Sequence, residues 1–220
     1  DVMKKAFHIA RSGRPGPVLI DVPKDVQQDL LGAHAARPPT RRTFVPARLP
    51  LPRGNLSRAA QLLSTARRPV IYCGGGLINA GPHACEMLAR LVRLLNAPCT
   101  LTLMGLGAFP ASDTRFLGML GMHGTLEANL AMHHADVVLN IGARFDDRVT
   151  GKVSEFSPWA RKIHVDIDAS SINKTVKVDV PIVGDCAEVL DALLQQPDLH
   201  GLDPDRLSPW WGHIANWRGR

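Results

Sequence analysis

The apolar positions of this 220-residue chain fall into short continuous runs, separated by stretches in which apolar residues recur at helical spacing. Continuous runs rich in Val, Ile and Leu predict strands that are buried on both faces, and the helical spacing predicts amphipathic helices. Alternation of the two is typical of a parallel sheet with helices on both sides. The predicted strands span 18–22, 69–73, 98–103, 136–141, 162–167 and 180–184, and the predicted helices 2–10, 56–66, 82–95, 125–134 and 187–194.

Prolines divide the chain into unequal parts. Residues 30–54 hold five prolines and predict a largely extended linker. We therefore expect residues 55–196 to form one α/β domain, residues 1–29 to be the tail of another, and residues 197–220 to lead into a third. The chain lacks an initiator methionine and begins inside a predicted helix, so we expect a segment of a longer protein.

Composition and charge exclude several classes of protein. Hydrophobic residues make up 45% of the chain, as in globular proteins, and 26 basic against 20 acidic residues give a net charge of +6. The arginines of the predicted linker have one aromatic residue, Phe44, among them, whereas a nucleic-acid site would gather both on one element. These arginines are either solvent-exposed residues of a linker or, as the more specific interpretation, residues that attract an anionic small ligand such as a dinucleotide. Steep salt-dependent DNA affinity would support the nucleic-acid alternative.

The sequence predicts a cytoplasmic protein without its own metal site. No apolar run is long enough to span a bilayer, and the first residues lack the apolar core of a secretory signal. The four cysteines lack C-x-x-C spacing and lie in apolar surroundings, which indicates reduced core residues. The adjacent His133 and His134 point about 100° apart on a helix and cannot form a metal-binding pair.

Glycines and charged residues directly follow the predicted strands. Ligands of open parallel sheets bind beyond the carboxyl ends of the strands, so these residues are candidates for a binding site. Glycines let the backbone approach a phosphate, carboxylates accept from ribose hydroxyls, and arginine pairs with pyrophosphate. Together they predict a dinucleotide site, and the candidates are Gly74, Gly75, Gly76, Gly142, Arg144, Asp166, Asp168, Gly184 and Asp185.

Each of these motifs also has a purely structural interpretation. The sequence "GGGLINAG" lacks the G-x-G-x-x-G pattern and is equally typical of a tight turn. Asp166 and Asp168 are typical turn formers, Asp185 is typical of a helix cap, and "GARFDDR" suits an exposed, salt-bridged loop. The prediction of a binding site therefore depends on their joint placement at consecutive strand ends.

A glycine repeat forms the other unusual stretch. Gly118, Gly121 and Gly124 recur at every third position, and His123 precedes a predicted helix. A glycine- and methionine-rich loop that enters a helix favours contact with a flat, polarisable ring over a place in the core.

Four stretches together resemble the large, catalytic subunit of the acetolactate synthase (acetohydroxyacid synthase) family: "SGRPGPVLIDVPKDVQ", "GMLGMHGTLEAN", "GARFDDRVTG" and "HVDIDASSINKTVKVDVPIVGD". The resemblance covers essentially the whole chain. Glyoxylate carboligase and pyruvate oxidase share the architecture, but "GARFDDRVTG" favours acetolactate synthase. A stand-alone FAD- or NAD-binding module on the same kind of sheet is a further alternative, which redox activity of a bound flavin would identify.

The resemblance implies three domains: a pyrimidine-binding domain, a central Rossmann-like FAD-binding domain of three layers, and a C-terminal domain that binds thiamine diphosphate and Mg²⁺. Residues 1–29 and 55–196 then belong to the first and second, and the catalytic glutamate lies outside this chain. "GDC" at 184–186, with Asn216, loosely resembles the family's magnesium motif, but Cys186 replaces a glycine and prolines interrupt the segment between. We thus expect no catalytic residue and no metal here, and an inactive segment.

The resemblance also implies an activity, partners and site residues. The complete enzyme condenses two pyruvates, or pyruvate and 2-oxobutyrate, with loss of CO2, and works as a dimer or tetramer that can take a small regulatory subunit. FAD does no net redox work in this family. The implied FAD contacts are Arg14, Gly74, Gly75, Gly76, His123, Gly124, Thr125, Gly142, Ala143, Arg144, Asp166, Ile167, Asp168, Gly184 and Asp185, and the implied channel to the thiamine is lined by Lys24, Met122, His123, Asp147 and Arg148.

Overall fold

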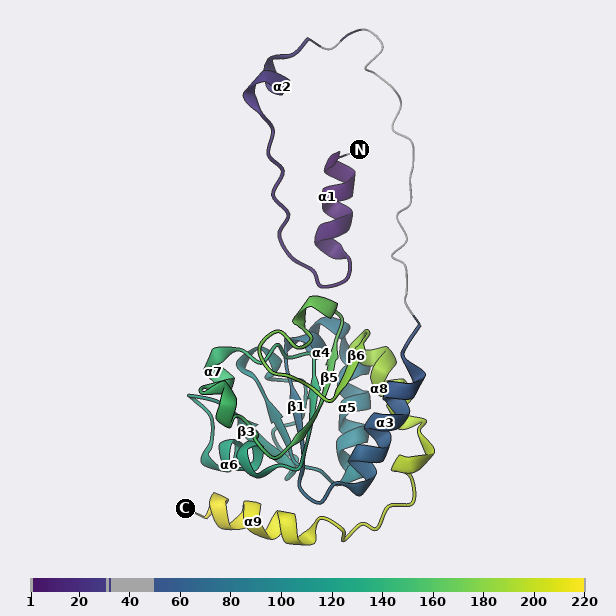
Figure 1. Cartoon of the computed structure of the whole chain (residues 1–220), viewed down its shortest axis with the longest axis vertical. Coiled ribbons are helices and arrows are strands. Elements are labelled where there is room, and N and C mark those ends of the chain that lie inside the picture. The colour runs from purple at the N-terminus through teal and green to yellow at the C-terminus, as the bar shows by residue number, and fades with distance from the viewer. Residues whose placement is uncertain (1, 31, 33–49, 220) are drawn as a thin grey trace. The chain divides into compact units, whose positions relative to one another are not determined.

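A computed structural model describes residues 2–30, 32 and 50–219 of the chain. The chain divides into two compact units, Asp1–Leu49 and Pro50–Arg220 (Figure 1). Within its described residues, the first unit contains α1 (Val2–Arg11) and α2 (Lys24–Gln28). Most of the predicted linker at 30–54 lies outside the described residues.

The strand predicted at 18–22 is wrong for this structure. Residues 15–23 belong to no helix or strand, and the side chain of Leu19 is 94% exposed. A strand needs a hydrogen-bonded neighbour, and no described residue of this chain pairs with the segment. Val18, Leu19 and Val22, like Val2 and Phe7 of α1, therefore remain exposed.

The second unit is built on a six-stranded parallel sheet with the order β3-β2-β1-β4-β5-β6. Every residue of β1, β2 and β4 is buried, so the continuous apolar runs do form strands covered on both faces. The predicted α/β fold with a parallel sheet is confirmed. The strands are β1 (Pro69–Cys73), β2 (Cys99–Leu101), β3 (Phe116–Met119), β4 (Val137–Ile141), β5 (Arg161–Asp166) and β6 (Val180–Val183).

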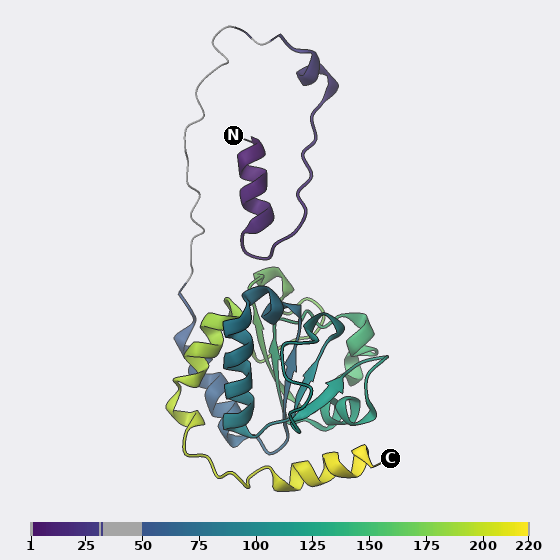
Figure 2. The ribbon, with the colours of Figure 1, turned by 180° about the vertical axis from the view of Figure 1, so that it is seen from behind.

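Helices cover the sheet on two sides. α3, α5 and α8 pack together on one side, and α6 and α7 lie on the other (Figures 1 and 2). Apolar residues at helical spacing account for the buried stripes of α3, α5 and α8. The helices are α3 (Arg53–Thr65), α4 (Gly75–Ala80), α5 (Pro82–Leu95), α6 (Leu126–His134), α7 (Asp147–Thr150), α8 (Cys186–Leu194) and α9 (Ser208–Arg218), with 3-10 turns η1 (Leu103–Gly105), η2 (Val153–Glu155), η3 (Ala169–Ser171) and η4 (Pro197–Leu199).

Several elements, among them β3 and α4, were not predicted from the sequence. β3 pairs with β2 in an irregular register at the start of the glycine repeat, and Gly118 inside it has a φ of +87°. Glycine is rare inside strands and weakens them, so the hydrophobic pattern of the sequence did not indicate this edge strand. α4 begins with two glycines, which are poor helix formers, and the sequence therefore indicated only a tight turn.

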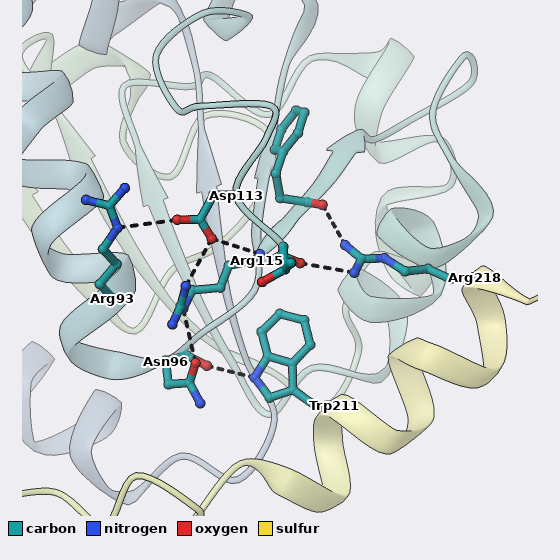
Figure 3. A network of polar contacts seen from close by, with 8 residues as sticks. Arg93, Asn96, Asp113, Arg115, Trp211 and Arg218 are labelled. Atoms are coloured by element: carbon teal, nitrogen blue, oxygen red, sulfur yellow. Dashed lines mark hydrogen bonds and ion pairs between the residues drawn. The ribbon is translucent and has the colours of Figure 1, made fainter.

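The C-terminal helix α9 lies across the amino ends of β1, β2 and β3. Trp210 Nε1 donates to the first carbonyl of β1 at 3.2 Å, and Trp211 Nε1 donates to the carbonyl of Asn96, ahead of β2, at 2.9 Å. Arg218 donates to the first carbonyl of β3 at 2.6 Å and to the carbonyl two residues before it at 3.0 Å (Figure 3). The segment expected to lead into another domain thus packs on this one, and its continuation stays a prediction.

Three further expectations concern cysteines, metals and membranes. All four cysteines are free thiols; Cys85 is half-buried and the other three are buried. Within residues 2–30, 32 and 50–219, no cluster of His, Cys, Asp and Glu has the arrangement of a metal site. None of the helices that the structure describes is both long and apolar enough to cross a membrane.

Candidate functional site

The order of the strands reverses between β1 and β4, and sheets of this order bind dinucleotides beyond the carboxyl ends at such a point. The loops that follow these two strands touch each other. The Gly74 amide donates to the carbonyl of Ile141 at 2.9 Å, and the Gly76 amide donates to the carbonyl of Gly142 at 3.0 Å. The glycine motif after β1 and the charged motif after β4 therefore form one surface, as predicted from their placement.

The glycines at this junction leave no room for side chains. A Cβ on Gly76 would lie 2.6 Å from the Cα of Gly142, and a Cβ on Gly142 would lie 2.7 Å from the Cα of Gly76. Gly142 also has a φ of +64°, which favours glycine. The structural interpretation of these glycines is confirmed, because loop packing alone requires them; contact with a phosphate stays a prediction.

The loop after β4 carries exposed charges around a buried ring. Arg144 and Asp146 form an ion pair at 2.9 Å, with both side chains more than half exposed. Phe145 between them is 1% exposed and has a φ of +57°. The alternative of an exposed, salt-bridged loop thus describes this pair of residues, and the predicted contact of Arg144 with a pyrophosphate stays a prediction.

A second loop joins this surface. The Met122 amide donates to the carbonyl of Arg148 at 2.9 Å, so the turn after β3 rests on α7. Met122, His123, Asp147 and Arg148 are all exposed on these two adjoining loops. Four of the five predicted channel residues are therefore brought together. The fifth, Lys24, belongs to the first unit, as does Arg14, and their part in this site stays a prediction.

The glycine repeat has a geometric cause. Gly118 and Gly121 have φ values of +87° and +91°. A Cβ on Gly121 would lie 2.5 Å from the carbonyl oxygen of Arg148, and a Cβ on Gly124 would lie 2.5 Å from that of Met119. The repeat thus lets the chain turn back on itself and pack on α7. The predicted contact of this loop with a flat ring is not tested by these distances.

The helix after this loop starts from a side-chain cap. The Thr125 hydroxyl accepts from the Ala128 amide at 3.2 Å and donates to the carbonyl of Leu117 at 2.6 Å. Thr125 thereby fixes the start of α6 next to the end of β3. Its predicted contact with FAD stays a prediction.

The carboxylates at the carboxyl ends of β5 and β6 make the local bonds that a turn or cap requires. Asp166, 6% exposed, accepts from the Asp168 amide at 2.9 Å. Asp168 accepts from the Ser170 amide, and Asp185 from the Ala187 amide at the start of α8, both at 2.9 Å. Turn and cap are thus confirmed, yet an ionised carboxylate accepts about four hydrogen bonds, so capacity for a ligand remains.

Apolar side chains at the same edge were not selected from the sequence. Leu103 and Met104, in the turn after β2, are 68% and 75% exposed, and a Cβ on Gly75 would lie 3.2 Å from the Cβ of Met104. Ile167, which the resemblance did imply, is 40% exposed after β5. Exposed apolar groups around a polar centre are typical of a binding surface. The signal in the sequence was the glycine pair, Gly105 and Gly107, that follows β2.

The chain is similar to proteins of known activity. Residues 56–193 match a family model described as thiamine pyrophosphate enzyme, central domain. The chain is 46% identical to the acetolactate synthase isozyme 3 large subunit of Escherichia coli, an alignment that covers 100% of this chain and 38% of that relative. Identity is 43% to the acetolactate synthase large subunit of Haemophilus influenzae (99% and 38% covered) and 41% to that of Corynebacterium glutamicum (99% and 34%). The chain thus spans little more than a third of the length of these relatives.

Proposed function

The chain belongs to the thiamine pyrophosphate enzymes, whose central domain it contains, and from this premise we propose that it is the central part of an acetolactate synthase large subunit. The observation that carries the proposal is the alignment of the whole chain, at 41–46% identity, with large subunits of three bacteria. The complete protein would join two pyruvates, or pyruvate and 2-oxobutyrate, with loss of CO2. Its products, 2-acetolactate and 2-aceto-2-hydroxybutyrate, lead to valine, leucine and isoleucine.

We propose the following division of the chain. Residues 1–29 are the tail of the pyrimidine-binding domain, residues 30–54 a linker, and residues 55–196 the central domain; residues 197–220 lead to the domain that binds the diphosphate of thiamine and Mg²⁺. The exposed apolar residues of the first unit, such as Phe7 and Leu19, support this division, because isolated domains rarely leave such groups uncovered. The catalytic residues then lie outside this chain.

The carboxyl edge of the sheet is the proposed site for FAD. The residues fit such a group: Arg144 offers charge-assisted hydrogen bonds to a pyrophosphate, and Asp166 and Asp168 offer acceptors for ribose or adenine. Leu103 and Met104 offer exposed apolar surface for a ring. Bound FAD supplies no net redox chemistry in the family that the chain resembles, so the role of these residues is to bind and orient it.

The joined loops after β3 and β4 are the proposed wall of the channel to the thiamine. Met122 and Arg148 are held together by a backbone hydrogen bond, which supports a common role for the two loops. Small 2-oxo acids carry a carboxylate, and the guanidinium of Arg148 suits such a group. We further propose that the complete protein is a cytoplasmic dimer or tetramer that can take a small regulatory subunit.

A ligand titration tests the cofactor proposal. The 220-residue chain is titrated with FAD and, separately, with NAD, while flavin fluorescence and the melting temperature are followed. We expect saturable FAD binding that raises the melting temperature, and none with NAD. Binding of NAD without FAD would identify the chain instead as a dinucleotide module of another kind, which the strand order also suits.

An activity assay tests the proposed reaction. The longer protein that contains this chain is incubated with pyruvate, thiamine diphosphate, Mg²⁺ and FAD, and 2-acetolactate is measured. We expect its formation, and the same assay on the 220-residue chain should give none. A longer protein that binds all its cofactors and releases no 2-acetolactate would overturn the assignment; release of acetyl phosphate or tartronate semialdehyde would point to the pyruvate oxidase or glyoxylate carboligase alternatives.

A further inference from the structure

A row of buried polar side chains crosses the sheet just inside its carboxyl edge. Thr100, Tyr72, Asn140 and His164 are successive partners in the register of β2, β1, β4 and β5. Each is at most 1% exposed. Strands covered on both faces are normally apolar, and a buried polar group destabilises the fold unless it is hydrogen-bonded. The hydrogen-bond partners of these four side chains should therefore explain why polar residues stand at these positions.

Two members of the row, on neighbouring strands, bond to the backbone of one residue, Ala143. Asn140 Nδ2 donates to the carbonyl of Ala143 at 2.7 Å, and Asn140 Oδ1 accepts from the Ala143 amide at 3.2 Å. His164 Nε2 lies 2.9 Å from the same carbonyl. Because a carbonyl only accepts, this nitrogen carries a hydrogen. The backbone of Ala143 is thus fixed at both its donor and its acceptor.

The held segment is one that would not keep its conformation unaided. Gly142 before it has a φ of +64°, and Phe145 after it has a φ of +57°. A non-glycine residue at positive φ is disfavoured and persists only where its surroundings impose it. The Phe145 ring meets the His164 ring edge-on, with centroids 5.0 Å apart. The row therefore restrains the loop through hydrogen bonds at Ala143 and through ring packing at Phe145.

We propose that Asn140 and His164 are positioning residues of the dinucleotide site. They touch no ligand themselves; they hold the backbone of Ala143 so that Arg144, the next residue, presents its guanidinium at the carboxyl edge. The inference rests on the proposed FAD site and adds the residues that determine its shape. His164 Nδ1 is buried and has no hydrogen-bond partner among the described residues, so Nε2 alone bonds, to Ala143, with Asp166 Oδ2 3.7 Å from the same nitrogen.

Substitutions separate this role from simple support of the core. His164→Leu and Asn140→Leu remove the hydrogen bonds and keep apolar bulk, whereas His164→Gln keeps an N–H donor at a similar reach. Val165→Ala is the matched control, because Val165 is fully buried, neighbours His164 and points to the opposite face of the sheet. All variants are made in the 220-residue chain and are used below their melting temperatures.

FAD affinity is the first readout. We expect both leucine variants to weaken FAD binding by about 10-fold or more, as befits the loss of hydrogen bonds that fix the site, and to shift the absorbance of the bound flavin. His164→Gln should recover most of the affinity. Val165→Ala should lower the melting temperature and leave the Kd within about 2-fold. Wild-type affinity in both leucine variants, or a glutamine variant no better than leucine, would overturn the proposal.

Amide hydrogen exchange without ligand is the second readout. The amides of Ala143 and Arg144 should exchange about 10-fold faster in the leucine variants than in the wild type and in Val165→Ala. Unchanged exchange would overturn the positioning role whatever the affinities show. If the leucine variants exchange faster but the wild-type chain binds no FAD, the result would count against the proposed cofactor and would still support the role of Asn140 and His164 in fixing the loop.

Discussion

The two ends of the sheet close in opposite ways. At the amino end, side chains of α9 donate hydrogen bonds to backbone carbonyls at or just ahead of the starts of the strands. At the carboxyl end, the backbone closes on itself through glycines, and side chains such as Met104, Met122 and Arg144 remain exposed. One end has its polar groups satisfied from within the chain, and the other leaves side chains available for something else. Substitutions at the amino end should therefore affect mainly the stability of the fold, and substitutions at the carboxyl end should affect ligand binding.

A charged network completes the amino end. The Asp113 carboxylate lies between Arg93 and Arg115, at 3.3 Å and 3.0 Å, and Arg115 Nε donates to Asn96 Oδ1 at 3.1 Å (Figure 3). Trp211 of α9 donates to the backbone of the same asparagine. This arrangement links the end of α5, the start of β3 and α9.

The largest effect on stability should come from Trp210→Ala at the amino end. Trp210 is 2% exposed, and its ring N–H bonds to the carbonyl of Pro69. We expect a loss of about 3–5 kcal/mol in the free energy of unfolding, because a large cavity and an unpaired carbonyl remain. Urea denaturation measures this free energy, and Trp159→Ala is the control because Trp159 is 75% exposed. FAD affinity should not change under conditions where the Trp210→Ala variant is folded. A loss of affinity there would contradict the assignment of stability to the amino end and of binding to the carboxyl end.

Gly142→Ala should affect both stability and binding at the carboxyl end. The new Cβ would lie 2.7 Å from Gly76 Cα at a φ of +64°, so we expect a loss of about 2–4 kcal/mol and of measurable FAD binding. Gly151→Ala is the control: its φ is +54°, but a Cβ there meets nothing within 4 Å. It should cost about 1–2 kcal/mol from backbone strain alone and leave FAD binding intact. Equal effects of the two substitutions would mean that the contact with Gly76 is unimportant.

Asp113→Asn should weaken the amino end in a pH-dependent way. Burial alone would raise the pKa of Asp113, but hydrogen bonds and charge from Arg115, with help from Arg93, lower it below its ordinary value. The ionised carboxylate of Asp113 therefore stabilises the fold fully above the pKa of Asp113 in the unfolded chain, about 4. This stabilisation is lost as the pH falls through the lower pKa of Asp113 in the folded chain. We expect Asp113→Asn to lower the free energy of unfolding by about 1–3 kcal/mol at pH 7.

Urea unfolding at pH 7 and at progressively lower pH measures this effect. The difference between wild type and Asp113→Asn should shrink as pH falls below 4, since the wild-type carboxylate then becomes protonated. Glu86→Gln, at an exposed position of α5, is the control and should be close to neutral at either pH. A difference that does not depend on pH would show that charge plays no part in this network.

The smallest effect on stability should come from Arg144→Ala. Its ion pair with Asp146 is more than half exposed, so we expect a change within about 0.5 kcal/mol. FAD affinity should nevertheless fall about 10- to 100-fold if the guanidinium binds the pyrophosphate. Arg161→Ala is the matched control, because Arg161 is equally exposed, is paired with Asp179 and lies at the amino end of β5. Similar FAD affinities of the two variants would contradict the assignment of Arg144.

The sequence revealed the core better than it revealed the site. The runs at 69–73 and 136–141 predicted β1 and β4 within one residue, because burial on both faces requires continuous apolar residues. The segment at 18–22 carries the same signal and forms no strand, since a strand depends on neighbours that a local pattern does not contain. β3 and α4 were missed because glycines gave a misleading local propensity.

At the carboxyl edge the limit is different. A glycine needed for loop packing and a glycine needed for a phosphate look the same in sequence, because both sites lack room for a Cβ. The positive φ of Phe145 leaves no trace in composition. Asn140 is visible as the one polar residue in "VVLNI", but its partner at Ala143, shared with His164, depends on the register between β4 and β5.

The most direct test of the separation between the two ends is hydrogen exchange of the 220-residue chain with and without saturating FAD. We expect protection in the loops at 74–76, 120–125 and 142–148, and unchanged exchange in α9 and at the starts of β1, β2 and β3. Protection concentrated in α9, or saturable binding that leaves all three loops unprotected, would contradict it and place the cofactor elsewhere.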